Sequence, residues 1–151
     1  MPRLPDGEEL QDLSIHAVVT TIIVTAGVIE RDGRFLITRR QKGVHLEGFW
    51  EFPGGKCDAG ETLDACLVRE LREELAVGAR VGSEIFRTTH DYADRRVELH
   101  FLKCELLDDP SPQIGQEMMW APRAQLKHLP FPPADAELIA MLARIESDRE
   151  P

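Results

Sequence analysis

The sequence lacks long apolar runs, a disulfide framework and an excess of basic residues. No segment approaches the ~18 consecutive apolar residues of a membrane span, so no membrane-spanning helix and no membrane partner are expected. Only 3 cysteines occur among 151 residues, without a CxxC spacing, which argues against a zinc site or a redox pair and indicates reduced thiols. Lys and Arg number 18 against 27 Asp and Glu, giving a net charge of -9, whereas domains that bind nucleic-acid backbones are usually basic. A nucleic-acid polymer is therefore not an expected partner.

The remaining composition is that of an ordinary globular protein, with 42% hydrophobic and 30% charged residues. Its length predicts one domain with a single core. Residues 1–14 are polar and acidic, unlike a signal peptide, and are expected to form an N-terminal arm. Residues 15–151 are expected to form the single domain. The cytoplasm is the expected compartment, and both a monomer and a homodimer remain open.

Strand and helix signals alternate along the domain. β-branched runs and turn signals predict strands over 18–30, 34–39, 49–52, 84–92, 97–107 and 118–120. Asp32-Gly33 is the expected hairpin turn, and Thr62 is the expected N-cap of a helix that ends near Leu75. A helical turn is predicted over 122–126 and a last helix over 134–146. This order predicts helices on both sides of a sheet.

Side-chain patterns also indicate which of these residues are buried. Trp50 and Phe52 lie between strand and turn signals and are expected in the core. The last helix carries an apolar stripe at helical spacing, which is expected to face the sheet. That stripe consists of Leu138, Ile139, Leu142 and Ile145.

The most informative stretch is Gly54–Val77, where a glycine pair and a polar loop precede a helix with several glutamates. Residues three and four apart share a helix face, so Glu70, Glu73 and Glu74 fall within an arc of about 100°. Carboxylates crowded in this way repel one another unless a cation or solvent covers them. Hard divalent ions such as Mg²⁺ prefer oxygen ligands and often bridge carboxylates to substrate phosphates. The stretch therefore indicates a metal-and-phosphate site, with a solvated acidic helix as the alternative.

The same stretch resembles the signature box of the Nudix hydrolases: Gly, five residues, Glu, seven residues, Arg-Glu, an aliphatic, any residue, Glu-Glu, any residue, Gly, an aliphatic. The matching residues here are Gly55, Glu61, Arg69, Glu70, Leu71, Glu73, Glu74 and Val77. The one departure is Ala76, where the family has a glycine that helps to end the helix in a left-handed turn. Gly78 is the expected substitute for that glycine.

The resemblance extends over residues 25–145 and favours the MutT branch, through the segments ITRR, WEFPGGK and PPAD and a late tryptophan. It implies an α/β/α sandwich on a mixed β-sheet. It also implies hydrolysis of a nucleoside triphosphate to a monophosphate and pyrophosphate. The expected cofactor is Mg²⁺, with Mn²⁺ as the alternative ion.

The resemblance further implies roles for the box residues. The ligands of the divalent metals correspond to the backbone carbonyl of Gly54 and the side chains of Glu70, Glu73 and Glu74. Glu70 is also a candidate for the base that activates water. Glu61 corresponds to a supporting contact with the loop or with a metal-bound water. Arg69 corresponds to an arginine that orients the glutamates and is expected to pair with Glu73 one turn away.

One carboxylate expected from the resemblance is missing. MutT-type enzymes often carry a metal-linked glutamate six residues before the late tryptophan, and counting back from Trp120 reaches Ile114. Glu117 is a candidate substitute from the same loop, and Glu98 is another from the neighbouring strand. The number of metals and the identity of the base therefore stay open.

Substrate contacts are implied at five positions. Arg40 matches an arginine placed at the nucleotide phosphates better than its neighbour Arg39 does, and Arg95 matches another arginine near the nucleotide. Asp135 corresponds to the residue that reads the base edge, although an aspartate there also suits a helix cap. Phe131 is expected either to stack on the base or to pack beneath the loop.

Three functions follow from these observations. The leading one is hydrolysis of a modified or surplus (d)NTP, including a cytidine-type nucleotide, as in nucleotide-pool sanitation. The second is hydrolysis of another nucleoside diphosphate derivative such as ADP-ribose, which the short chain and PPAD disfavour. The third is a nucleotide-binding module with weak or no turnover, which Ala76 and Ile114 support and the intact box glutamates oppose.

Overall fold

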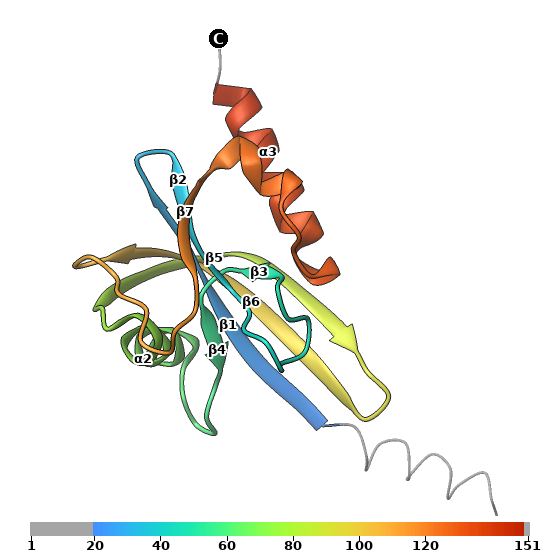
Figure 1. The fold of residues 1–151 in the computed structure, drawn as a ribbon. Coiled ribbons are helices and arrows are strands. Elements are labelled where there is room, and N and C mark those ends of the chain that lie inside the picture. The colour runs from blue at the N-terminus through green and yellow to red at the C-terminus, as the bar shows by residue number, and fades with distance from the viewer. Residues whose placement is uncertain (1–19, 150–151) are drawn as a thin grey trace, which may run out of the picture.

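The computed structural model describes residues 20–149, in which a mixed β-sheet lies between two α-helices (Figure 1). The expected arm over residues 1–14 lies outside the described residues. The strands are β1 (Thr20–Arg31), β2 (Arg34–Arg39), β3 (Trp50–Glu51), β4 (Gly54–Lys56), β5 (Ala79–Asp91), β6 (Arg95–Leu106) and β7 (Met118–Pro122). The helices are α2 (Leu63–Leu75) and α3 (Ala136–Arg149), with 3₁₀ turns η1 (Arg123–His128) and η2 (Pro133–Asp135).

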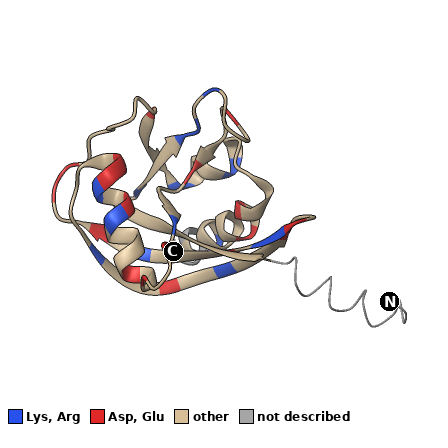
Figure 2. Ribbon diagram, turned by 90° about the horizontal axis from the view of Figure 1, so that it is seen from below, with Lys and Arg blue, Asp and Glu red and all other residues tan. Residues whose placement is uncertain are grey.

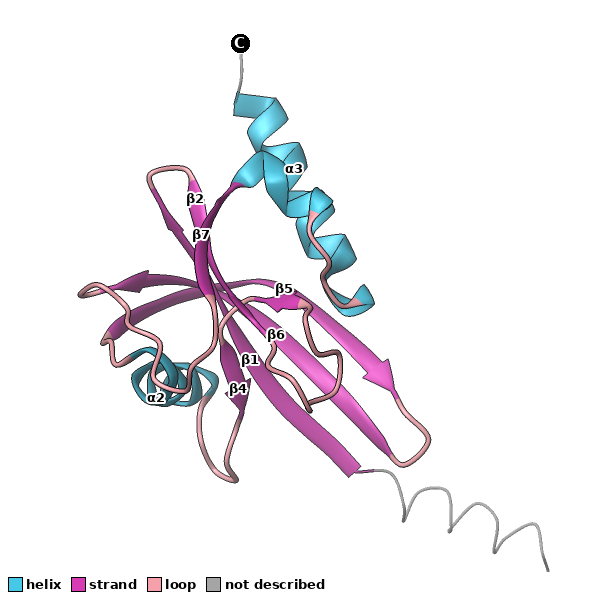
Figure 3. Cartoon of the chain, viewed as in Figure 1, coloured by secondary structure: helices cyan, strands magenta, loops and turns pink. Residues whose placement is uncertain are grey.

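Strand β1 organises the 7-stranded sheet, whose main order is β3-β2-β1-β6-β5. β1 pairs in parallel with β6 and antiparallel with β2 and β4, so the sheet is mixed, as predicted. β7 pairs with β2 in an antiparallel register. Figure 3 shows α2 and α3 on opposite sides of these strands. The predicted α/β/α architecture is confirmed.

The hairpin between β1 and β2 confirms the predicted turn. Asp32 and Gly33 have φ angles of 54° and 75°, and Arg31 pairs with Arg34 across them. A two-residue turn with both φ angles positive matches the right-handed twist of the strands.

Two apolar cores fill the space between the sheet and the helices. One packs α3 against the sheet and includes Trp50 and Phe52, which are buried as predicted. The other packs α2 against the opposite face through Leu67, Leu71 and Leu75. Three of the four residues predicted to form the buried stripe of α3 are buried. The fourth, Ile145, is 40% exposed. The prediction for Ile145 is wrong because this residue borders an open cavity of about 900 Å³.

Helix α2 ends at Leu75, as predicted, but the expected role of Gly78 in ending it is wrong. Ala76 itself adopts the left-handed conformation (φ 53°, ψ 41°), and its amide donates to the Arg72 carbonyl at 3.0 Å. The carbonyl of Gly78 accepts a hydrogen bond from the Leu107 amide at 2.9 Å, next to the ladder between β5 and β6. The chain must therefore turn before Gly78, and Ala76 takes the conformation that glycine adopts with less strain.

Other boundaries differ by a few residues. Gly54–Lys56 is a short strand rather than a loop, and β5 starts at Ala79 instead of residue 84, with irregular pairing between Val81 and Phe86. Within residues 20–149, no helix has the length and apolarity needed to cross a bilayer. Charged residues of both signs are interspersed over the strands and helices (Figure 2).

Candidate active site

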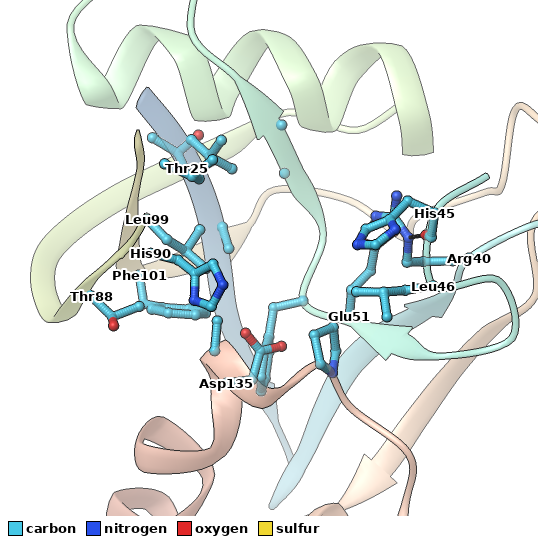
Figure 4. Close-up of a pocket in the computed structure, with 18 of the residues that line it drawn as sticks. Thr25, Arg40, His45, Leu46, Glu51, Thr88, His90, Leu99, Phe101 and Asp135 are labelled. Atoms are coloured by element: carbon cyan, nitrogen blue, oxygen red, sulfur yellow. Dashed lines mark hydrogen bonds and ion pairs between the residues drawn. The ribbon is translucent and has the colours of Figure 1, made fainter. Parts of the chain in front are cut away.

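A cavity of about 390 Å³ opens beside the central strands, the 40–46 loop and the segment before α3. Apolar side chains from β1 and β6, among them Val24, Leu99 and Phe101, form much of its wall. Helix α2 crosses one end of the cavity, and Asp135 lies near the other end, where α3 begins (Figure 4). The charged and imidazole side chains that line it are Arg40, His45, Glu51, Glu74, His90 and Asp135.

Helix α2 carries the box glutamates, and local signals fix where it begins. The Thr62 hydroxyl accepts a hydrogen bond from the Ala65 amide at 3.1 Å, which confirms the predicted N-cap. The preceding loop is tied by Glu61, whose Oε1 accepts from the Asp58 amide at 2.8 Å. The loop and the first turn of α2 are thereby fastened together.

Arg69 joins this loop to the glutamates of α2. Its guanidinium donates to both carboxylate oxygens of Glu61, at 2.7 and 3.0 Å, and to Glu70 Oε2 at 2.8 Å. The expected pair with Glu73 is present at 3.3 Å, so it is longer than the other contacts. A further donation to the Lys56 carbonyl, at 3.0 Å, fixes the same guanidinium to the end of β4. The Arg69 hydrogen bonds, assisted by the Asp58 amide, lower the pKa of Glu61 to about 2.

The glycine pair allows β4 to approach both β1 and α2. A Cβ atom on Gly55 would overlap the Glu70 carboxyl group, and one on Gly54 would overlap the Thr25 carbonyl oxygen. Gly54 pairs with Ala26 and Gly55 with Thr25 in the ladder between β1 and β4. Glycine at these positions therefore lets the backbone lie directly against the carboxyl group of Glu70.

Glu74 is the box carboxylate that lines the cavity. Burial, followed by its hydrogen bond with Glu70 and the charges of Glu70, Glu51 and Glu73, raises the pKa of Glu74 to about 9. Four carboxyl groups are therefore crowded close enough to penalise one another's ionisation.

This crowding provides a test of whether a divalent cation fits. Within the described part of the chain, no three His, Cys, Asp or Glu side chains already form a metal cluster, and Arg69 holds Glu70 and Glu61 instead. The donors are nevertheless carboxylate oxygens, which Mg²⁺ prefers, and a cation would relieve the repulsion that keeps Glu74 protonated. The donor chemistry therefore fits a hard divalent ion.

Glu51 is a cavity residue that the sequence interpretation missed. Its Oε1 accepts from Arg40 Nη1 at 2.8 Å, and burial raises its pKa although Arg40 opposes that shift. Arg40 also donates through Nε to the His45 carbonyl at 2.6 Å. The available signal was a single acidic residue between two core aromatics, Trp50 and Phe52, just before the glycine pair.

Asp135 is only 5% exposed, and its carboxyl group lines the cavity. Burial, with a smaller contribution from the charge of Glu51, raises the pKa of Asp135 to about 7. In η2 its amide donates to the Pro132 carbonyl at 3.0 Å. The carboxyl group is thus available to a ligand in the cavity.

The other predicted substrate residues lie outside this cavity lining. Phe131 stacks on Phe52, with ring centroids 5.4 Å apart, and packs against the core beneath α3. Arg95 lies over the ring of Tyr92 at 5.1 Å, and Tyr92 itself lines the cavity. Arg39 contributes to a smaller neighbouring cavity of about 170 Å³, which shares Arg40, Glu51 and Glu74 with the first.

The loop before β7 contains the predicted substitute ligand. Glu117 forms an ion pair with Arg39 at 3.0 Å, and its side chain is 65% exposed. Ile114 is 55% exposed, and its carbonyl accepts from Gln41 at 2.6 Å. Gln116 is buried and donates to the Glu74 carbonyl at 3.2 Å, so this loop packs against the end of α2. The other candidate, Glu98, contacts His100 Nε2 at 3.1 Å.

The fold and the site define a Nudix-type hydrolase, an enzyme that cleaves phosphoric anhydrides. A NUDIX domain model matches residues 24–141, and the chain belongs to that family. The 8-oxo-dGTP diphosphatase of Haemophilus influenzae is 38% identical over 124 residues, which cover 80% of this chain and 90% of that protein. The CTP pyrophosphohydrolase of Escherichia coli is 32% identical over 129 residues, covering 85% of this chain and 96% of that protein. The solution structure of the E. coli ORF135 protein superposes with a TM-score of 0.75 at 31% identity, covering 88% and 96% of the two chains.

Proposed function

We propose that the enzyme hydrolyses a nucleoside triphosphate to a nucleoside monophosphate and pyrophosphate in the presence of Mg²⁺. The observation that carries this proposal is a single cavity lined both by Glu74 of the box helix and by Asp135 beyond an apolar wall. The apolar wall suits a base, and the end next to α2 suits the phosphates. The relatives named for 8-oxo-dGTP and CTP support a modified or surplus (d)NTP, with guanine and cytosine nucleotides as candidates.

Glu70, Glu73, Glu74 and the Gly54 carbonyl are the groups that would hold Mg²⁺, with Mn²⁺ as the alternative ion. When bound, the metal supplies charge neutralisation of the phosphates and activation of water. Glu117 would first have to leave its ion pair with Arg39 to join them.

The other side chains of this site are proposed to position the glutamates, to contact the phosphates and to accept a proton. Arg69 holds Glu70 and Glu61 in place through charge-assisted hydrogen bonds, which are shorter and stronger than neutral ones. Arg40, held by Glu51, is positioned to contact the phosphates, with Arg39 beside it in the adjoining cavity. Glu70 and Glu74 are the candidates to accept the proton from the attacking water.

Asp135 is proposed to recognise the base. A protonated carboxyl group donates and accepts a hydrogen bond, whereas the carboxylate only accepts. Because the Asp135 pKa lies near 7, both forms are present at neutral pH. An exocyclic amine beside a ring nitrogen, as on cytosine or guanine, offers a matching edge. Arg95 and Phe131 are proposed to support the base indirectly, through the cavity-lining residues Tyr92 and Phe52.

The test is a panel of nucleoside triphosphates, their oxidised forms and ADP-ribose, incubated with Mg²⁺ and analysed for nucleoside monophosphate, pyrophosphate and phosphate. Pyrophosphate in equal amount to monophosphate is expected, and chelation of the metal should abolish it. Glu74→Gln should lower kcat by at least about 100-fold while leaving the melting temperature of the metal-free protein unchanged, since Glu74 is protonated there.

Two outcomes would contradict the proposal. Cleavage confined to ADP-ribose would assign the enzyme to diphosphate derivatives. Nucleotide binding without product, equal in wild type and Glu74→Gln, would identify a binding module without turnover.

A further inference from the structure

The loop between β6 and β7, residues 107–117, packs against the last turn of helix α2 (Figure 1). An α-helix leaves the carbonyl groups of its last turn without partners inside the helix. Here the loop provides those partners. The Ser111 amide donates to the Leu75 carbonyl at 2.8 Å, and the Gln113 amide donates to the Glu74 carbonyl at 2.9 Å. The end of α2 that carries Glu74 is therefore held by a loop that is distant in the sequence.

Gln116 is a buried side chain of this loop, with 7% of its surface exposed, whereas its neighbours Gly115 and Glu117 are exposed. Its Nε2 donates to the Glu74 carbonyl at 3.2 Å, and its Oε1 accepts from the Ile114 amide at 3.1 Å. Both ends of the buried amide group are thus paired, as burial of a polar group requires. The Gln116 side chain connects the backbone of the box helix to the backbone of the loop.

A second glutamine extends this connection to the residue after Arg40. Gln41 Nε2 donates to the Ile114 carbonyl at 2.6 Å, so the backbone of Ile114 accepts from one glutamine and donates to the other. Gln41 directly follows Arg40, which is proposed to contact the phosphates. Arg40, Gln41, Glu74, Ile114 and Gln116 all line the neighbouring cavity of about 170 Å³. Hydrogen bonds therefore run without a break from the Glu74 carbonyl to the residue beside Arg40.

We propose that Gln116 and Gln41 are positioning residues for the hydrolysis, which together fix where Arg40 lies relative to Glu74. This inference rests on the proposed function, in which Glu74 would hold the metal and Arg40 would contact the phosphates. Glu74 belongs to α2 and Arg40 follows β2, so neither element by itself fixes the separation of the two side chains. The connection through Ile114 joins the two elements directly.

Two features favour positioning over simple packing. The Gln113 amide already pairs with the Glu74 carbonyl, so Gln116 is not required to satisfy the end of the helix. A side chain that only filled this buried space would be apolar, because an apolar group costs nothing to desolvate. The side chain of Ile114 also offers no oxygen that a metal could use to hold the loop. Gln116 instead ties the loop to α2 through the protein itself.

The first experiment compares wild type with Gln116→Met, which keeps the length of the side chain and removes both hydrogen bonds. For the best substrate of the nucleotide panel, kcat/KM is expected to fall about 10-fold, because small misplacements of catalytic groups are costly. Gln125→Met, at an exposed position of η1, is the matched control and should stay within about twofold of wild type. Gln116→Leu provides a second variant, with the same expected loss, if Gln116→Met fails to fold. Wild-type kcat/KM in the Gln116 variant would overturn the proposal.

A double-mutant cycle tests whether the two glutamines act as one connection. Gln41→Met should also lower kcat/KM by about 10-fold. Since breaking either end already frees Arg40 from Glu74, the double variant should lose about the same 10-fold rather than more. Independent contributions would multiply to a loss of about 100-fold, and that result would overturn the connection.

Mn²⁺ binding to the substrate-free enzyme, followed by electron paramagnetic resonance, needs no turnover. Gln116→Met is expected to weaken Mn²⁺ binding by about 10-fold, because groups that orient metal ligands contribute to metal affinity. Gln41→Met leaves the bond between Gln116 and Glu74 in place and should change the Mn²⁺ affinity by less than about threefold. Equal Mn²⁺ binding by wild type and Gln116→Met, including none by either, would overturn the positioning role. The expected loss of Mn²⁺ affinity in an enzyme that cleaves no nucleoside triphosphate would instead overturn the proposed function alone.

Discussion

Arg69 Nε lies 2.7 Å from Glu61 Oε2, and Arg69 Nη1 lies 2.8 Å from Glu70 Oε2, so one guanidinium links the loop carboxylate to a glutamate of the helix. The planar fork of arginine is needed for this geometry, since lysine offers a single charged nitrogen. Arg69→Lys is therefore expected to lower kcat/KM by about 10–100-fold, in line with losses of groups that orient metal ligands. Steady-state kinetics across a Mg²⁺ titration would measure it.

The control for Arg69→Lys is Arg72→Lys, an exposed arginine on the same helix. This change should leave kcat/KM within about twofold of wild type, because surface substitutions away from such contacts are usually near neutral. Equal effects of the two substitutions would show that the Arg69 contacts do not organise the site.

Gly55 is a second position where the structure makes a direct prediction. The methyl group of Gly55→Ala would overlap the Glu70 carboxyl group, and displacing it should cost about 1–3 kcal/mol of unfolding free energy. Activity should fall more than this loss of stability explains, because Glu70 moves. Chemical denaturation and kinetics on the same preparation would separate the two effects.

Gly82→Ala serves as the matched control, since a Cβ atom there would meet the Lys103 carbonyl oxygen at a tolerable 3.4 Å. It should retain full activity. Full activity of Gly55→Ala as well would contradict the close approach of β4 to Glu70.

Ala76 occupies the left-handed position that ends α2, with φ 53°. A glycine there avoids the clash between Cβ and backbone, so Ala76→Gly is expected to stabilise the protein by about 1 kcal/mol. Thermal unfolding would measure this gain, with kcat unchanged. The substitution Gly78→Ala should have a much smaller effect, whereas the reverse order of effects would place the helix end at Gly78.

The contrast between Ala76 and Gly78 illustrates what the sequence can predict. The start of α2 was predictable because Thr62 and the apolar spacing act within one or two turns. The end near Leu75 was also predicted, but the residue that takes the left-handed turn after it depends on where β5 begins to pair with β6, which is a tertiary contact. Local propensity favoured Gly78, but the strand pairing requires the turn at Ala76.

The candidate site likewise has a part that the sequence predicts and a part that depends on tertiary contacts. The box glutamates share one helix face, so their clustering follows from helical periodicity. The contact between Arg40 and Glu51 and their proximity to Asp135 join segments that are distant in sequence. No sequence spacing encodes these contacts, and the sequence interpretation missed Glu51.

Asp135 gives a prediction about stability and pH. Its carboxyl group has an ordinary pKa of 3.8 and a folded value of about 7, so between these values the folded protein keeps a proton that the unfolded chain releases. Stability should therefore fall as pH rises from about 4 to 7. Asp135→Asn removes this loss and should be more stable than wild type by about 2–4 kcal/mol above pH 7, with little difference near pH 4. Denaturation at several pH values would measure the difference.

If Asp135 contacts the base, its ionisation should also change the preference of the enzyme between substrates. Below pH 7 the protonated group can donate to a ring nitrogen such as that of cytosine, and above pH 7 the carboxylate only accepts, as from the amine and ring N–H of guanine. The ratio of kcat/KM for CTP to that for 8-oxo-dGTP should therefore fall as pH rises through about 7, and Asp135→Asn should flatten this dependence. Parallel pH profiles for both substrates, in wild type and variant alike, would show that Asp135 does not read the base.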